Sequence, residues 1–316
     1  MQLITGGMGF IGLHTAKAIL DAGDDVVLTM WRTRREPDFI KPHLGNRAKV
    51  EVVDVVDKDA LIEAGKKHNV DGIVHLAVPG LGALTPAEDF KTNMEGLLNI
   101  LQVAEELKVK RISIASSTAV YSGLGDGPYT EDDRLPMKSG NPTEAFKKAF
   151  EILGLHYADR AGMDVVMLRI AGIWGPLYHS MANLPSRLTH AAVKGADPNL
   201  AGGRGGVPHA EDTGDLCYVK DCAQGIQKVQ LAENLPRRIY NIGGGRATSW
   251  GELLSAVQAA VPGFNVQLNP GKGPGHKENA YLSLENTTAD TGYKPSWSLN
   301  DAVKDYADWL KAGNPQ

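Results

Sequence analysis

The first half of the chain alternates short apolar runs, rich in β-branched residues, with longer segments of helical period. The short runs predict five strands, over residues 2–5, 25–30, 50–53, 72–76 and 111–116. Helices are expected over residues 11–22, 58–67, 93–107 and 143–161, and another apolar run follows over 164–170. Strict alternation of strand and helix predicts an α/β fold, in which helices cover both faces of a doubly wound parallel sheet.

The alternation stops after Gly172, where segments rich in proline and glycine begin. Residues 200–213 (LAGGRGGVPHAEDT) have the composition of a loop, whereas residues 250–261 and 300–310 are typical of amphipathic helices. We therefore expect residues 1–172 to form the domain that contains the parallel sheet. Residues 173–316 should form mainly a smaller lobe that caps the sheet, with some segments returning to it.

Composition narrows the choice of partners and compartment. The 316 residues are 42% apolar and 22% charged, as in ordinary globular proteins, and the net charge of −4 gives no general attraction to nucleic acid or membranes. The longest apolar stretches are well short of the ~20 residues of a membrane helix, and no signal-peptide pattern precedes the first strand. Cys217 and Cys222 fit no common zinc spacing and are interpreted as core thiols. We expect a cytoplasmic protein that handles a small molecule and has no metal site.

A glycine-rich turn joins the first predicted strand to the first predicted helix. Residues 5–12 (TGGMGFIG) place Gly6, Gly9 and Gly12 in a G-x-x-G-x-x-G pattern. Glycines at such a turn let backbone N–H groups approach a pyrophosphate at the positive end of the helix. The alternative is a merely structural turn, but the position between strand and helix favours a dinucleotide site.

The end of the second predicted strand indicates which dinucleotide binds. Proteins that bind NAD usually carry a carboxylate about 20 residues beyond the glycines, to accept from the ribose hydroxyls. Here Met30 stands at that point, and residues 31–35 (WRTRR) follow it. Arginine forks bind phosphate in bidentate fashion, so this cluster predicts NADP(H) ahead of NAD(H). A solvated basic loop is the alternative interpretation.

Further motifs give the chain a resemblance to a known family. Residues 75–78 (HLAV), 116–121 (SSTAVY), 168–176 (LRIAGIWGP), 215–221 (DLCYVKD) and 240–243 (YNIG) are similar, in this order, to landmarks of the extended short-chain dehydrogenases. That group contains sugar-nucleotide epimerases, dehydratases and many ketoreductases. The resemblance covers nearly the whole chain and implies a Rossmann-type sheet with a C-terminal substrate-binding lobe. It also implies that Asp54 contacts the adenine and that Asn93 has a structural role.

The chain departs from this family at its catalytic tyrosine. Family members carry a tyrosine with a lysine four residues later, on one face of a helix, so that the lysine lowers the pKa of the phenol. Here Lys147 is present, but Thr143 stands at the tyrosine position. None of the tyrosines in the chain has a lysine four residues later. An aliphatic hydroxyl cannot replace a phenol as a proton donor. Either the proton comes from another group, for which Tyr178 and His179 are candidates, or the chemistry needs no proton at that point.

These motifs together define the expected site. The residues expected to act in catalysis are Ser117, Thr143, Lys147 and Tyr178, and Thr118 is an alternate for the hydroxyl that the resemblance assigns to Ser117. Those expected to bind the cofactor are Gly6, Gly9, Phe10, Ile11, Gly12, Arg32, Arg35, Asp54, Val55, Leu76, Ala77, Val78, Asn93 and Lys147.

The leading functional hypothesis is an NADP(H)-dependent oxidoreductase that acts on a small carbonyl or alcohol. The alternatives are an epimerase, dehydratase or lyase that uses bound cofactor, and a sensor of NADP(H) without catalysis. The resemblance also implies a homodimer that pairs through residues 93–107 and 143–161, with apolar area from Leu97, Ile100, Leu101, Phe150 and Leu153.

Overall fold

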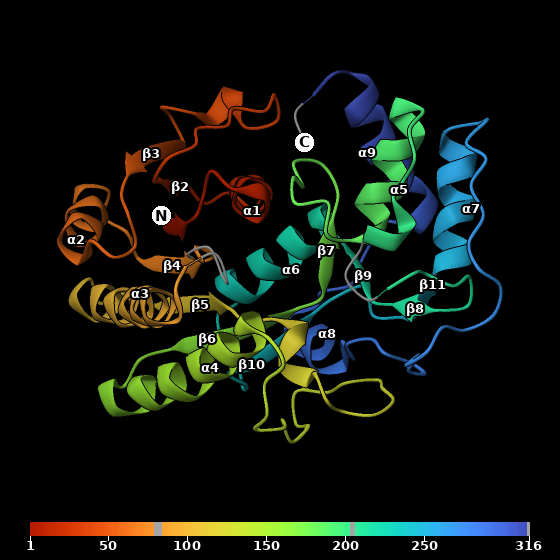
Figure 1. Cartoon of the computed structure of the whole chain (residues 1–316). Helices are drawn as coiled ribbons and strands as arrows, with labels where there is room; N and C mark the ends of the chain where they lie inside the picture. Colours follow the sequence, from red (N-terminus) through yellow and green to blue (C-terminus); the bar gives the residue numbers. More distant parts are fainter. Residues whose placement is uncertain (79–83, 203–205, 315–316) are drawn as a thin grey trace.

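A parallel sheet organises the structure, which is a computed structural model describing residues 1–78, 84–202 and 206–314 (Figure 1). Within these residues the sheet has seven strands in the order β10-β6-β5-β4-β1-β2-β3. They are β1 (Gln2–Thr5), β2 (Val26–Met30), β3 (Ala48–Val52), β4 (Gly72–His75), β5 (Arg111–Ala115), β6 (Val165–Ile170) and β10 (Ile239–Ile242). The strand order reverses beside β1, and ligands of such sheets bind outside the carboxyl ends of the strands at this switch point. The predicted fold class is confirmed.

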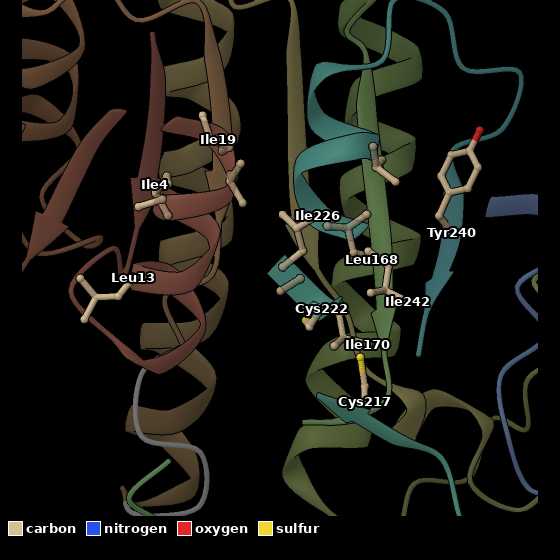
Figure 2. Close-up of a cluster of buried hydrophobic side chains, with 14 of the residues drawn as sticks. Ile4, Leu13, Ile19, Leu168, Ile170, Cys217, Cys222, Ile226, Tyr240 and Ile242 are labelled. Carbon is tan, nitrogen blue, oxygen red and sulfur yellow. The ribbon is translucent and has the colours of Figure 1, made fainter. Parts of the chain in front are cut away.

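Helices cover the two faces of the sheet. On one face of the sheet pack α1 (Phe10–Asp21) and α6 (Val219–Leu231). On the other face pack α2 (Lys58–Lys67), α3 (Pro86–Glu106) and α4 (Pro142–Ala161). The strands are buried on both faces, which explains why they have nearly continuous apolar sequences. Figure 2 shows part of the first core, a buried cluster that includes Ile4 of β1, Leu13 of α1 and Ile226 of α6.

The second half of the chain builds a lobe and also extends the sheet. The lobe contains α5 (Leu184–Lys194), α7 (Trp250–Ala260) and α9 (Leu299–Lys311), which share a separate core, and α8 (Glu285–Thr291) lies beside β10. Two small sheets pair β7 (Gly172–Trp174) with β9 (Leu216–Tyr218) and β8 (Thr213–Gly214) with β11 (Thr248–Ser249). Both cysteines are free and buried in the core between sheet and α6 (Figure 2). The expected division of the chain at residue 172 stays a prediction.

The predicted elements lie within one or two residues of the observed ones, except for the start of α3. This helix begins at Pro86, seven residues before the predicted start at residue 93. Thr85 and Glu88 form a capping box, in which the Thr85 side chain accepts from the Glu88 backbone and Glu88 accepts from the Thr85 N–H. Proline is favoured at the first helical position. The sequence therefore contained a start signal that the apolar periodicity alone did not reveal.

One buried histidine joins α1 to the second half of the chain. His14 is 5% exposed, and its Nε2 lies 3.1 Å from the Pro176 carbonyl oxygen. Burial lowers the pKa of His14 from 6.5 to about 4, so the ring is neutral at pH 7 and Nε2–H donates to this carbonyl. Pro176 lies in a turn where Gly175 and Leu177 both have positive φ, 132° and 75°. His14 thus fixes the turn that leads into the lobe.

We expect His14 to make the protein sensitive to mild acid. Because its pKa is lower in the folded than in the unfolded state, its contribution to stability is complete above pH 6.5 and is lost as the pH falls towards 4. At pH 5 protonation of His14 in the unfolded chain lowers the free energy of unfolding by about 2 kcal/mol. His14→Gln keeps an N–H donor and cannot titrate. Denaturant unfolding at pH 7 and pH 5 should therefore show a smaller loss for this variant than for the wild type.

The matched control is His156→Gln, which replaces an exposed histidine of α4 and should lose as much stability as the wild type does. Equal losses for wild type and His14→Gln would contradict the account.

Candidate active site

The turn between β1 and α1 accepts only glycine at its closest points. Gly6 has φ +64°, its N–H donates to Thr29 Oγ1, and its carbonyl accepts from the Gly9 N–H at 2.9 Å. A Cβ on Gly12 would lie 2.3 Å from the Gly6 carbonyl oxygen, inside any tolerated contact. The glycines therefore hold the first turn of α1 tightly against the end of β1, as the pattern predicted.

The N-terminus of α1 is open to an anion. Gly9 is its N-cap and forms no side-chain cap, and the first turn carries no acidic residue. Unpaired backbone N–H groups and the positive end of the helix dipole therefore face outward, where a pyrophosphate is stabilised. These features fit the phosphates of a dinucleotide.

A cavity of about 1020 Å³ lies at this end of the sheet. Most of the expected cofactor residues line it: Gly6, Gly9, Phe10, Ile11, Gly12, Arg32, Asp54, Val55, Leu76, Ala77 and Val78. Other lining residues were missed from the sequence: Thr29, Trp31, Val53, Val56, Leu84, Glu88, Lys91, Thr92 and Glu95. The last four belong to the first turns of α3, whose early start the periodicity did not predict. The size and the mixed lining suit a ligand as large as a dinucleotide.

Three expected cofactor residues lie outside this cavity lining. Arg35 donates from Nη1 to the Met8 carbonyl at 3.4 Å and so joins the loop after β2 to the glycine turn. Asn93 is buried and donates from Nδ2 to the carbonyl and carboxylate of Asp89. Lys147 belongs to the expected reaction centre, which is described below.

The end of β2 presents a stacked aromatic–arginine pair. The guanidinium carbon of Arg32 lies 3.6 Å from the centroid of the Trp31 ring, and both side chains line the cavity. Arg34 instead forms an exposed ion pair with Glu36. Of the three arginines in this cluster, Arg32 is therefore the one whose side chain lines the cavity.

Lys147 and Ser117, two residues of the expected reaction centre, lie at the end of β5. Lys147 lies on α4, is 5% exposed, and donates from Nζ to the Ala115 carbonyl at 2.5 Å. Two residues after Ala115, the Ser117 hydroxyl accepts from the Ala119 N–H at 3.1 Å. Thr143 is half-buried one helical turn before Lys147. Burial lowers the pKa of Lys147 to about 8, although the Glu151 carboxylate opposes this shift.

A buried polar network supports this centre from behind. Glu151 and Arg169 form a bidentate ion pair whose side chains are 5% and 3% exposed. The Ser116 hydroxyl donates to Glu151, and Arg169 donates to the Tyr121 hydroxyl at 2.9 Å. Burial raises the pKa of Tyr121 to about 12, so this phenol stays protonated.

The two candidate proton donors of the lobe lie elsewhere. Tyr178 packs edge-on against Phe10, with ring centroids 5.2 Å apart, at the N-terminus of α1. His179 is exposed and lines the large cavity. Their roles as proton donors stay predictions.

A second cavity, of about 440 Å³, lies in the lobe. Its lining includes Gly172, Arg187, Asp212, Asp215, Trp250, His276 and Lys277. Asp215 accepts from the backbone N–H groups of Gly244 and Leu282, and burial raises its pKa to about 6. The composition of this lining, aromatic and charged, suits a polar ligand.

Comparison with known families matches residues 2–243 to the model described as "NAD dependent epimerase/dehydratase family". The chain belongs to this family. The resemblance to extended short-chain dehydrogenases is thereby confirmed, and the family description names NAD as the cofactor.

Similar proteins cover almost the whole chain. The low-salt glycan biosynthesis protein Agl12 of Haloferax volcanii is 25% identical and covers 97% of both chains. A UDP-glucose 4-epimerase of Neisseria gonorrhoeae is 27% identical, over 98% of this chain and 96% of its own.

Solved structures agree on the fold. The UDP-glucose 4-epimerase of Thermotoga maritima with UDP-glucose has a TM-score of 0.81 at 21% identity, over 99% of both chains. That of Thermus thermophilus with NAD has a TM-score of 0.73 at 25% identity, over 98% of both chains.

Two further observations concern the described residues alone. They contain no cluster of three or more His, Cys, Asp or Glu side chains arranged to hold a metal ion. None of their helices has the length and apolar character needed to span a membrane.

Proposed function

We propose that this family member binds a nicotinamide dinucleotide in the large cavity and transforms a nucleotide-linked sugar by epimerase or dehydratase chemistry. The observation that carries the proposal is that Lys147 and Ser117 lie at the end of β5. This strand pairs with β4, and the residues that follow β4 line the large cavity. The names of the similar proteins favour this alternative over the reductase that led the sequence-based hypotheses.

Each part of the site has a distinct task in this proposal. The Gly6–Gly12 turn and the open N-terminus of α1 hold the pyrophosphate, and Asp54, which lines the same cavity, contacts the adenine. When bound, the nicotinamide supplies reversible hydride transfer. Ser117 holds the reacting substrate oxygen, and Lys147 fixes the nicotinamide ribose. The lobe cavity receives the nucleotide part of the substrate, with Arg187 and Lys277 as cationic groups in its lining.

A reductase that acts on a small carbonyl is the second candidate. It is favoured by the end of β2, where Met30 offers no carboxylate and Arg32 lines the cavity, because this arrangement suits NADP(H), which many reductases use. Thr143 is the feature that favours the third interpretation, a cofactor sensor without catalysis.

A substrate panel separates these functions. Purified protein is incubated with UDP- and dTDP-linked sugars, and products are identified by mass spectrometry and NMR. Parallel reactions contain NADPH and simple ketones or aldehydes, with absorbance followed at 340 nm. We expect conversion of a nucleotide sugar without net consumption of cofactor. Consumption of NADPH by a simple carbonyl, with no nucleotide sugar converted, would establish the reductase instead.

The cofactor preference follows from Arg32. Because a charge-assisted bond to a 2′-phosphate is worth about 1.4 kcal/mol or more, we expect NADPH to bind at least ~10-fold tighter than NADH. Arg32→Ala should remove most of this difference in titration calorimetry. Arg34→Ala is the matched control, since Arg34 is paired with Glu36 at the surface. Equal affinities of the wild type for both cofactors would rule out the preference.

We also infer a homodimer that pairs through α3 and α4. Of the residues expected to supply its apolar area, Leu97, Ile100, Leu101 and Phe150 are instead buried within the core, and only Leu153 is exposed. The exposed apolar side chains on these helices are Phe90, Leu98, Ile152 and Leu153. A hollow of about 640 Å³ between the helices is lined in part by Leu98 and Leu153. Exposed apolar side chains on two neighbouring helices are typical of a protein interface.

Light scattering at micromolar concentration should give twice the 33.9 kDa of one chain. Leu153→Glu should give the monomer, because an interface excludes an unpaired charge. Val52→Glu, at an exposed apolar position on β3, should stay dimeric. A wild-type mass of one chain would exclude the dimer.

A further inference from the structure

We propose that Lys147 itself exchanges the proton of the substrate hydroxyl, in place of the missing phenol. This inference rests on the proposed function, because it assigns the proton step of that same site. It differs from the first expectation, in which Tyr178 or His179 supplied the proton and Lys147 only held the cofactor.

Among the residues that the structure describes, no carboxylate forms an ion pair with the Lys147 amine. Its Nζ donates to a neutral acceptor, the Ala115 carbonyl, and lies 5.0 Å from the centroid of the Phe150 ring. Glu151 lies one helical turn further along α4, but both of its oxygens are bonded to Arg169. A buried ammonium without a counter-ion loses its proton readily. The pKa of about 8 is the expected result, and it is close to the operating range of a general base.

Thr143 is a smaller side chain than the tyrosine that family members carry one helical turn before the lysine. A tyrosine there would place its ring and hydroxyl between the helix and the substrate, one turn before the lysine. Threonine is smaller than tyrosine, and the proposal requires that a substrate hydroxyl approach Lys147 past Thr143, directly or through one water. In this account the substitution that removes the phenol also lets the lysine meet the reacting oxygen.

His75 is the neighbouring imidazole, and its hydrogen bonds exclude it as a proton carrier. Thr5 Oγ1 accepts from the N–H groups of Leu76 and Ala77, so its own proton is donated to His75 Nδ1 at 2.8 Å. Nδ1 is therefore an acceptor, and the ring is neutral. Burial, reinforced by the charge of Lys147, lowers the pKa of His75 to about 3.

The other titratable groups packed near α4 are committed as well. The Tyr121 hydroxyl donates to Asn241 Oδ1 and accepts from Arg169, inside the core. The Glu144 carboxylate pairs with Lys148 on the same helix. Among the described residues around this centre, Lys147 is the group that can gain and lose a proton near neutral pH without breaking an ion pair.

The proton step balances with the substrate and the bound cofactor. In the oxidative direction the neutral amine of Lys147 would take the proton from the substrate hydroxyl as the C–O double bond forms, and an oxidised nicotinamide, when bound, would supply the acceptor for the hydride from the same carbon. In the reverse direction the ammonium returns the proton to the carbonyl oxygen. Since the amine form is required first, turnover should rise with pH up to about 8 and then level off.

The first test measures the lysine directly. Protein with ¹³C-labelled lysine is titrated by NMR in the presence of cofactor, and the Lys147 Cε signal is assigned as the one that Lys147→Arg removes. We expect it to titrate near pH 8, well below the signals of exposed lysines. A Lys147 that stays charged through pH 10 would overturn the proposal, whatever substrate the protein converts.

The second test is a mutant cycle. In the wild-type background, Lys147→Arg should retain cofactor binding, measured by fluorescence titration, but lose at least ~100-fold in turnover, because arginine cannot release a proton. In the Thr143→Tyr background the same substitution should cost less than ~10-fold, since the phenol then carries the proton. Equal losses in both backgrounds would show that Lys147 acts only as a fixed charge.

Two controls complete the cycle. Lys148→Arg changes the neighbouring lysine, which is paired with Glu144, and should leave the pH profile unchanged. Thr143→Ala should have a modest effect, because threonine carries no proton in this account. If no nucleotide sugar is converted by any variant, the proposed function fails, and the NMR titration still decides the state of Lys147.

Discussion

The buried ion pair of Arg169 and Glu151 is the interaction on which the arrangement of the site depends. It joins β6 to α4 in the interior, where an unpaired charge would cost several kcal/mol. The same arginine holds the Tyr121 hydroxyl, which bonds to Asn241 on β10, the strand that the second half of the chain adds to the sheet. One pair therefore fixes the lysine-bearing helix and ties both halves of the chain to it.

Much of the cofactor half could be predicted from the sequence because its signals are local. Gly6 and Gly12 mark a turn that tolerates no Cβ, and the turn lies between a strand and a helix that periodicity identifies. Strands buried on both faces have apolar runs that are visible without knowing their neighbours. The cavity at the carboxyl ends of these strands then follows from the topology of any parallel sheet of this order.

The remaining parts depend on contacts between residues that are distant in sequence. The surface of α3 and α4 is an example, because the helical period marks Leu97 and Leu98 equally as apolar, but only the sheet decides that Leu97 is buried and Leu98 exposed. Tyr178 is another example, because its contact with Phe10 forms only when the turn that leads into the lobe packs against the start of α1. The early start of α3 is a different case, because the capping box at Thr85 was readable but lay outside the apolar pattern.

With threonine at position 143, the ion pair of Arg169 and Glu151 also affects the charge state of Lys147. In a tyrosine-containing site the lysine needs to stay charged, and a nearby carboxylate shared with it would serve that end. Here Glu151 is bound by Arg169 and by the Ser116 hydroxyl, so its capacity to stabilise a charge on Lys147 is largely used. A lysine that is buried, short of a counter-ion and no longer covered by a phenol is suited to move a proton rather than to hold one. In the proposed mechanism, the missing phenol and the proton role of Lys147 are therefore linked through this one ion pair.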